Sequence, residues 1–178
     1  MQVNYMELLR NGACRDGVLR YVKQTNRLHS NVDALTLIDG HNTRGDLIWL
    51  LDVKLSASVM RVLAAKACSE LLPYLRGEFA HELDYELVRD ALADLDNVSP
   101  NASLTHEARD ITRRIVCDMN MMNAARNPMR AIRHALGNPK FHSYDASIEL
   151  CLAYAEKRNR TELINTIDEV IRVGLSHD

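Results

Sequence analysis

The chain has 178 residues, of which 47% are hydrophobic and 26% are charged, and its formal net charge is −2. A net charge this close to zero gives no overall attraction to nucleic acid or to membrane surfaces. No stretch of the sequence approaches the roughly 20 apolar residues that a membrane-spanning helix needs. The length predicts one domain, residues 1–178, with a division into halves 1–97 and 98–178 as the alternative.

The four cysteines lie far apart in the sequence, and no two of them form a Cys-x-x-Cys pair. This pattern is typical of reduced thiols in an intracellular protein, with disulfide pairing as the less favoured alternative. The N-terminus lacks the basic region and apolar run that mark a secretory signal. We therefore expect a cytoplasmic protein with four reduced cysteines: Cys14, Cys68, Cys117 and Cys151.

Apolar residues recur at helical spacing along most of the chain, and strand signals are scarce. In chain order, the first predicted elements are two short helices separated near Asn11–Gly12, the second of which ends near Gln24. A short helix over residues 32–39 follows, and Asn31 is its expected N-cap.

A capping box is predicted where Thr43 is followed three residues later by Asp46. Such a pair satisfies two backbone N–H groups at a helix start, so it predicts that a helix over residues 45–55 begins here.

The stretch RVLAAKACSELLPYL, residues 61–75, is crowded with small and apolar residues. Its polar positions fall on a narrow strip, which is typical of a central, buried helix. Ser56 or Ser58 is the expected cap, and Pro73 lies where it would kink or end the helix. Cys68 lies mid-helix among alanines, away from the helix N-terminus or the cation that a catalytic thiol requires. We therefore expect Cys68 to be a packed core thiol.

The second half of the chain continues the helical pattern. Residues 81–97 carry an apolar stripe opposite a row of acids: Leu83, Leu87, Ala91, Leu92 and Leu95. The later segments are a long helix from 104 to about 125, a short helix 128–137 closed by Gly137, a turn at 138–141, and an antiparallel pair 143–159 and 161–175. In total the sequence predicts about seven to nine helices and therefore an all-α fold, either a helical bundle or a short stack of helical hairpins.

Sequence signatures of common enzymes are absent, because there is no P-loop, no G-x-G-x-x-G and no G-x-S-x-G. Glu78 and His81 form one Glu-x-x-His pair, whereas a di-iron bundle needs two. His106 and Asp110 lie one helical turn apart and could share a metal. We expect no metal and no cofactor, so a metal-dependent enzyme that uses His81 and His106 is the least favoured function.

Charge is distributed unevenly along the chain. Residues 70–96 hold eight acids against two bases, and residues 109–140 hold seven bases against two acids. Three interpretations of these blocks are open. In the first, the two blocks face each other or form solvated helix faces. In the second, the acidic face binds a basic partner or mimics DNA, and in the third, the basic stripe contacts phosphates. The candidates for protein binding are Glu78, Glu82, Glu86, Asp90 and Asp94. The candidates for nucleic-acid binding are Arg126, Arg130 and Arg133, at helical spacing but without interleaved aromatic residues.

Three segments resemble the all-helical immunity proteins of bacteria: DLIWLLDVKL, VMRVLAAKACSELLPYLRGE and HSYDASIELCLAYAEK. In that family a tryptophan-bearing helix precedes an alanine-rich helix, and a later helix carries alanines after a histidine. The stretch LLRNGACRDGVLRYV is similar to the start of small uncharacterised phage and prophage proteins. This chain reads Ala67-Cys68-Ser69-Glu70 where the family usually reads Ala-Asp-Cys-Ala, and residues 97–140 match poorly.

The resemblance implies a small helical protein that binds another macromolecule, and it brings no catalytic residues with it. An immunity protein neutralises a toxin, and a phage relative would inhibit a host protein. We therefore expect a non-enzymatic, cytoplasmic protein-binding protein of immunity or phage-accessory type. A nucleic-acid-binding accessory protein is the alternative, and a homodimer is compatible with the number of apolar stripes.

Overall fold

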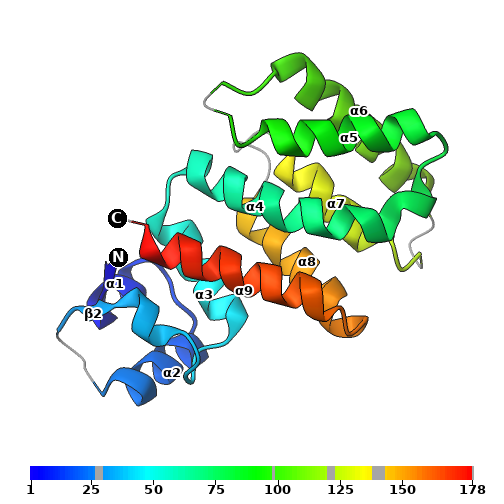
Figure 1. Ribbon diagram of the computed structural model, residues 1–178. Coiled ribbons are helices and arrows are strands. Elements are labelled where there is room, and N and C mark those ends of the chain that lie inside the picture. Colours follow the sequence, from blue (N-terminus) through cyan, green and yellow to red (C-terminus); the bar gives the residue numbers. More distant parts are fainter. Residues whose placement is uncertain (27–29, 98, 120–122, 138–142, 178) are drawn as a thin grey trace. The chain divides into compact units, whose positions relative to one another are not determined.

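The computed structural model describes residues 1–26, 30–97, 99–119, 123–137 and 143–177 (Figure 1). These residues form nine α-helices, two 3₁₀ helices and one pair of two-residue strands, joined by loops. The protein is therefore all-α. None of the described helices combines the length and the apolar character needed to cross a membrane. The chain forms two compact units, and it passes from one unit to the other between residues 55 and 56 and again between residues 167 and 168.

Unit 1 consists of residues 1–55 and 168–178. Strands β1 and β2 pair antiparallel, with Gln2 opposite Asp33. The elements in chain order are β1 (Gln2–Val3), α1 (Tyr5–Arg10), α2 (Arg15–Thr25), β2 (Val32–Asp33), the 3₁₀ helix η1 (Ala34–Leu37), α3 (Arg44–Lys54) and the second part of α9 (Thr161–Ser176).

The expected break between the first two helices is confirmed. It contains Gly12, whose φ of 79° is a left-handed value that glycine adopts without strain. The predicted helix over residues 32–39, by contrast, is wrong in its start and its cap. Val32 and Asp33 pair with β1 instead, and the Asp33 carboxylate accepts a hydrogen bond from the backbone N–H of Leu35 at 3.1 Å. Asn31 does not cap a helix, since its side chain accepts a hydrogen bond from Asn4 at 2.9 Å.

Unit 2 consists of residues 56–167. Its central helix is α4, which packs against α5, α7 and α8, while α7 also packs against α6 and α8. The elements in chain order are α4 (Ala57–Leu71), the 3₁₀ helix η2 (Leu72–Glu78), α5 (Glu82–Asp94), α6 (Ala102–Asp118), α7 (Arg126–Ala135), α8 (Tyr144–Lys157) and the first part of α9.

The prediction of a central, buried α4 is confirmed. The Ser56 hydroxyl accepts a hydrogen bond from the helix start, and α4 ends directly before the segment that holds Pro73. Cys68 is fully buried as expected. Its Sγ lies 3.3 Å from the Ser147 hydroxyl and 3.7 Å from the Cys151 Sγ, and Ser147 donates to the carbonyl of Ala131 at 2.7 Å. This buried contact joins α4, α7 and α8.

Two predictions in the second half of the chain are wrong. Leu83 is 75% exposed, because the buried line of α5 runs through Tyr85, Val88 and Leu92 rather than through Leu83. The long helix predicted to reach about residue 125 ends at Asp118. Residues 120–122 of that prediction, the turn at 138–141, and Lys140 of the basic block lie outside the described residues. The short helix α7 begins at Arg126, two residues before its expected start.

Candidate functional site

Unit 1 contains a cavity of about 460 Å³ that we call the unit-1 pocket. Its wall is formed by α1, the turn between α1 and α2, the first turns of α2, η1 and the first half of α3. Most of that wall is apolar, and Trp49 is only partly buried there. The buried apolar residues of the wall are Leu8, Tyr21, Leu37, Leu47 and Leu50. A largely apolar hollow with a few polar groups is the usual form of a binding site.

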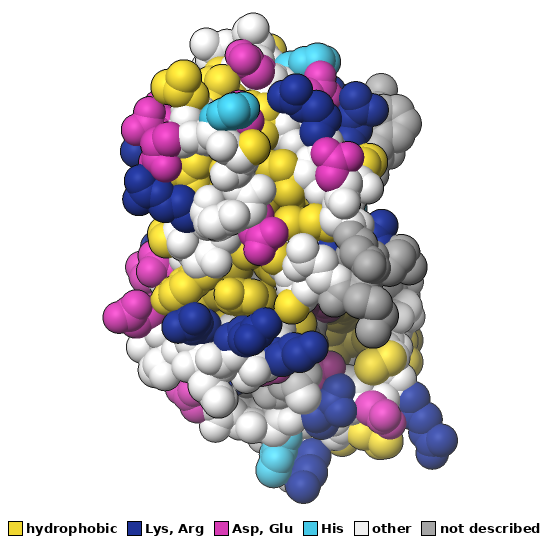
Figure 2. All heavy atoms as spheres, turned by 90° about the vertical axis from the view of Figure 1, so that its right-hand side faces the viewer, with side chains coloured by type: hydrophobic (Ala, Val, Ile, Leu, Met, Phe, Trp, Pro, Cys, Tyr) yellow, Lys and Arg dark blue, Asp and Glu magenta, His cyan; other side chains and the backbone are white. Residues whose placement is uncertain are grey.

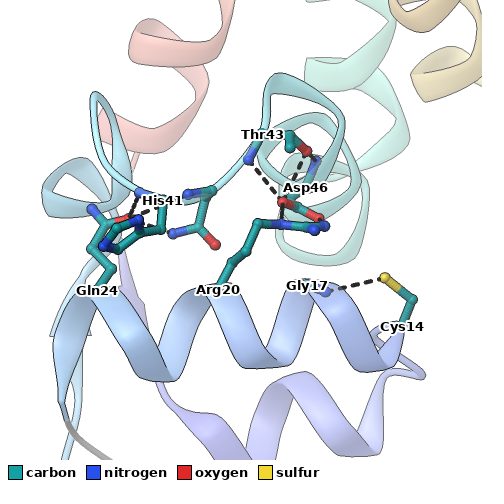
Figure 3. Close-up of polar contacts among 8 residues, drawn as sticks. Cys14, Gly17, Arg20, Gln24, His41, Thr43 and Asp46 are labelled. Atoms are coloured by element: carbon teal, nitrogen blue, oxygen red, sulfur yellow. Dashed lines mark hydrogen bonds and ion pairs between the residues drawn. The ribbon is translucent and has the colours of Figure 1, made fainter.

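The polar side of the unit-1 pocket is built where α2 faces the start of α3 (Figure 3). Thr43 and Asp46 form the capping box that the sequence predicts, and the structure confirms both of its hydrogen bonds. The Asp46 carboxylate accepts from the Thr43 backbone N–H at 2.8 Å, and Thr43 Oγ1 accepts from the Asp46 backbone N–H at 3.2 Å. The box fixes the first turn of α3 at the rim of the pocket.

Arg20 on α2 supplies the second partner of the Asp46 carboxylate. Its Nε and Nη2 donate to the two carboxylate oxygens, each at 2.7 Å. Burial opposes the ionisation of Asp46, but the hydrogen bonds from Arg20 and Thr43 outweigh it, so the pKa of this carboxyl lies below its ordinary value. The two-point contact therefore holds α2 and α3 together beside the pocket.

Gly17 allows α2 to come this close to α3. A Cβ at this position would lie 3.0 Å from Asp46 Oδ1 and 3.4 Å from Cys14 Sγ. The first distance is shorter than ordinary van der Waals contact and the second lies at its lower limit, so a larger residue would require the Asp46 side chain to shift.

The loop that leads into α3 is held by the side chain of Gln24. Gln24 Oε1 accepts from the backbone N–H of His41 at 2.8 Å and from the Asn42 side chain at 2.7 Å, while Nε2 donates to the Thr36 carbonyl at 2.6 Å. A Cβ on Gly40 would lie 2.0 Å from Gln24 Cδ and would therefore clash with the Gln24 side chain. The Gln24 side chain therefore positions the loop, and it occupies the space that a side chain at residue 40 would need.

Cys14 is exposed, lines the unit-1 pocket and stands at the N-cap of α2. Its Sγ accepts a hydrogen bond from the Gly17 backbone N–H at 3.3 Å (Figure 3). The thiol thus takes the place of the hydroxyl or carboxylate that usually caps a helix.

The acidic candidates all lie on or beside α5, and three of them are engaged locally. Glu82 pairs with Arg76 at 2.5 Å, Asp90 pairs with its neighbour Arg89 at 2.8 Å, and Asp94 accepts from the Asn101 backbone N–H at 2.5 Å. The two others are Glu86, which is partly buried, and Glu78, which is exposed. Figure 2 shows acidic and basic side chains interspersed over the upper part of one face, at the height of α5 and α6.

The basic candidates lie on α7, which buries Met129, Ile132 and other residues on its opposite side. Arg130 is exposed, whereas Arg126 and Arg133 are partly buried. The structure therefore places the three arginines on one helix, and Arg130 is the most accessible of them.

The two histidines of the metal hypothesis lie in separate cavities. His81 lines a hollow with Glu78, Asp84 and Asp118, and His106 lies on α6 with its Nδ1 3.5 Å from Asp110. Within the described part of the chain, no group of three or more histidine, cysteine, aspartate or glutamate side chains is arranged to hold a metal ion.

The sequence interpretation missed the unit-1 pocket. It identified the Thr43–Asp46 box but read it only as a helix start, and it treated Cys14 only as one of four reduced thiols. The missing information is the pairing of Asp46 with Arg20, which lies 26 positions earlier. A helical residue facing another element across a loop leaves no periodic signal in the sequence.

Comparison of the chain with protein-family models, with curated protein sequences and with solved structures returned no match.

Proposed function

We propose that this protein is a non-enzymatic binding protein that associates stoichiometrically with another protein, and that the unit-1 pocket receives an apolar side chain of that partner. The observation that carries this proposal is the state of the polar groups at the pocket rim. Asp46, Thr43 and Asn42 are all bonded to other groups of the protein. Polar groups that are already paired position the wall of a pocket, whereas a catalytic acid or base needs a free site for the substrate.

A protein partner is favoured over a free small molecule by the apolar surface beside the pocket. Leu9 is 45% exposed. It lies next to the pocket, because its carbonyl accepts a hydrogen bond from the backbone N–H of Gly12, a residue of the pocket wall. Met6, three residues earlier on α1, is 44% exposed. An apolar side chain in the pocket, with neighbouring apolar contacts around it, is the usual core of a protein interface.

The finer part of the proposal rests on the resemblance to bacterial immunity proteins and small phage proteins. It makes the protein a cytoplasmic inhibitor that binds a toxin or a host protein. In this proposal the acidic residues Glu78, Glu82, Glu86, Asp90 and Asp94 supply a second contact surface for a basic partner. Because three of the five are engaged within the protein, we assign the larger share of the binding energy to the unit-1 pocket.

The experiment is affinity capture of the tagged protein from an extract of the cells that produce it, after nuclease treatment, with identification by mass spectrometry. Three baits separate the two surfaces: the wild type, Gly45→Leu in the pocket wall, and the triple charge reversal Glu82→Lys, Glu86→Lys and Asp90→Lys. We expect one stoichiometric protein with the wild type, a large loss with Gly45→Leu and a smaller loss with the charge reversal. Equal recovery with the wild type and Gly45→Leu would contradict the pocket as the binding site.

A further inference from the structure

Unit 2 contains a second hollow, of about 260 Å³, which we call the basic cavity. Its charged and ionisable lining residues are Arg61 on α4 and Arg109 and His106 on α6, and none of its lining residues is acidic. Apolar groups complete the wall, Leu95 and Leu136 among them. Two positive side chains that line the same hollow repel each other, and an anion between them would offset that repulsion.

Arg61 on α4 has an incompletely hydrogen-bonded guanidinium group. Its Nε is buried and has no hydrogen-bond partner within the described residues. The positive charge of Arg61 acts on Tyr144, whose hydroxyl donates to the carbonyl of Gly137 in the cavity wall at 3.0 Å. Buried donors are normally paired, so an unpaired guanidinium nitrogen at a cavity indicates a missing acceptor.

Arg109 also has no ion pair or side-chain hydrogen bond within the described residues. Arg113, one turn further along α6, differs in this respect because its Nε lies 3.7 Å from Asp110. Asp110 is also the acid beside His106, at 3.5 Å. The nearby carboxylate is therefore shared by Arg113 and His106, and the guanidinium of Arg109 is left for another anion.

The start of α6 also lies at this cavity, but the Asp94 carboxylate accepts from the Asn101 backbone N–H there at 2.5 Å and offsets the positive end of the helix. Ala102, the first residue of this 17-residue helix, lines the basic cavity. The Asn101 side chain already accepts from the N–H groups of Ser103 and Leu104, so these two groups are not free for a ligand. The donors for a ligand come from the two arginines and the histidine.

We propose that the basic cavity binds the phosphate group of a small phosphorylated molecule. Two guanidinium groups from different helices suit a doubly charged, tetrahedral anion better than a flat carboxylate, because its oxygens can be bound from two different directions. The volume lies just below the range of about 300–1,000 Å³ that is typical of pockets for larger organic ligands. The cavity therefore accommodates a phosphate with a small attached group rather than a nucleic-acid strand. This site is independent of the unit-1 pocket.

The test is a calorimetric titration of the full-length protein with inorganic phosphate and, separately, with pyrophosphate. Arg109→Gln is the test variant and Arg113→Gln is the matched control, because both remove one arginine charge from α6. We expect one site in the wild type, at least tenfold weaker binding in Arg109→Gln, and wild-type binding in Arg113→Gln. The absence of saturable binding to either probe, or an equal loss in both variants, would overturn the proposal.

A second measurement separates loss of the site from loss of the fold. Phosphate that binds the folded protein raises its unfolding temperature by mass action. We expect this rise in the wild type and in Arg113→Gln, and a smaller rise in Arg109→Gln and Arg61→Gln, with unchanged helix content by circular dichroism. A short single-stranded oligonucleotide is the third probe. If it bound more tightly than pyrophosphate, and Arg109→Gln weakened that binding, the small-molecule assignment would be wrong.

Discussion

Arg20 and Asp46 form a two-point ion pair, with both nitrogen–oxygen distances at 2.7 Å, that connects α2 to the first turn of α3. Asp46 is at the same time the acid of the capping box that starts α3. One carboxylate therefore fixes both the start of a helix and its distance from the neighbouring helix. The unit-1 pocket lies between these two elements, so its shape depends on this pair.

Replacing Asp46 by Asn should loosen this part of unit 1. The amide keeps one acceptor but loses the charge, so the hydrogen bonds to Arg20 and Thr43 weaken. Allowing for the partial exposure of the pair, we expect a loss of about 1 kcal/mol in the free energy of unfolding. Chemical denaturation of both proteins at neutral pH measures it. An unchanged midpoint would mean that the ion pair contributes nothing to stability.

The same substitution should remove a pH dependence. Because the pKa of Asp46 in the folded state lies below its ordinary value of 3.8, ionised Asp46 stabilises the fold at pH values above about 4. That contribution is lost as the pH falls through the folded-state pKa. The difference in stability between the wild type and Asp46→Asn should therefore shrink over the interval in which the pH falls below about 4. A difference that stays constant over this interval would show that the carboxylate is not held ionised by its partners.

The thiols should divide into two classes of reactivity. Cys14 and Cys117 are exposed, whereas Cys68 and Cys151 are buried. The hydrogen bond to Cys68 and burial both raise the pKa of Cys151, which disfavours the reactive thiolate. A maleimide should thus label two cysteines in the native protein and four after unfolding, as counted by mass spectrometry. Labelling of Cys68 or Cys151 at the rate of Cys14 would contradict the packing of α4 against α8.

Two leucines of α5 provide a matched test of which face is buried. Leu92 is 2% exposed and Leu83 is 75% exposed, although the sequence places both on one apolar stripe. Leu92→Ala should cost about 2–5 kcal/mol of unfolding free energy, because it leaves a cavity. Leu83→Ala should change it by less than about 0.5 kcal/mol, as surface substitutions do. Similar losses in both variants would place Leu83 in the core and refute this orientation of α5.

Local signals in the sequence were sufficient where the structure depends on neighbours along the chain. The Thr43–Asp46 box and the buried position of Cys68 are predicted correctly, and Ser56 is one of the two expected caps of α4, since each follows from residues within a few positions. The cap at Asn31 and the burial of Leu83 were predicted wrongly, because pairing with β1 and packing against α6 and α4 decided them. The unit-1 pocket and the basic cavity are each lined by segments that lie far apart in the sequence, such as those that hold Arg61 and Arg109, and no spacing in the sequence reports this.

The central claim is that a protein partner inserts an apolar side chain into the unit-1 pocket, and Gly45 offers the most direct test. Gly45 lies in the first turn of α3 and lines the pocket, and an added Cβ would meet only Thr43 Oγ1, at 3.8 Å. A larger residue there fits the helix and favours it by about 0.5–1 kcal/mol over glycine. Gly45→Ala is the control, because it brings the same helical advantage with little added volume.

The measurement is the affinity of the captured partner for the wild type, Gly45→Ala and Gly45→Leu, together with the unfolding temperature of each. The predicted result is near-normal binding by Gly45→Ala and at least tenfold weaker binding by Gly45→Leu, although Gly45→Leu is as stable as the wild type or more stable. Undiminished binding by a stable Gly45→Leu protein would contradict the claim, because the partner would then bind without using the pocket.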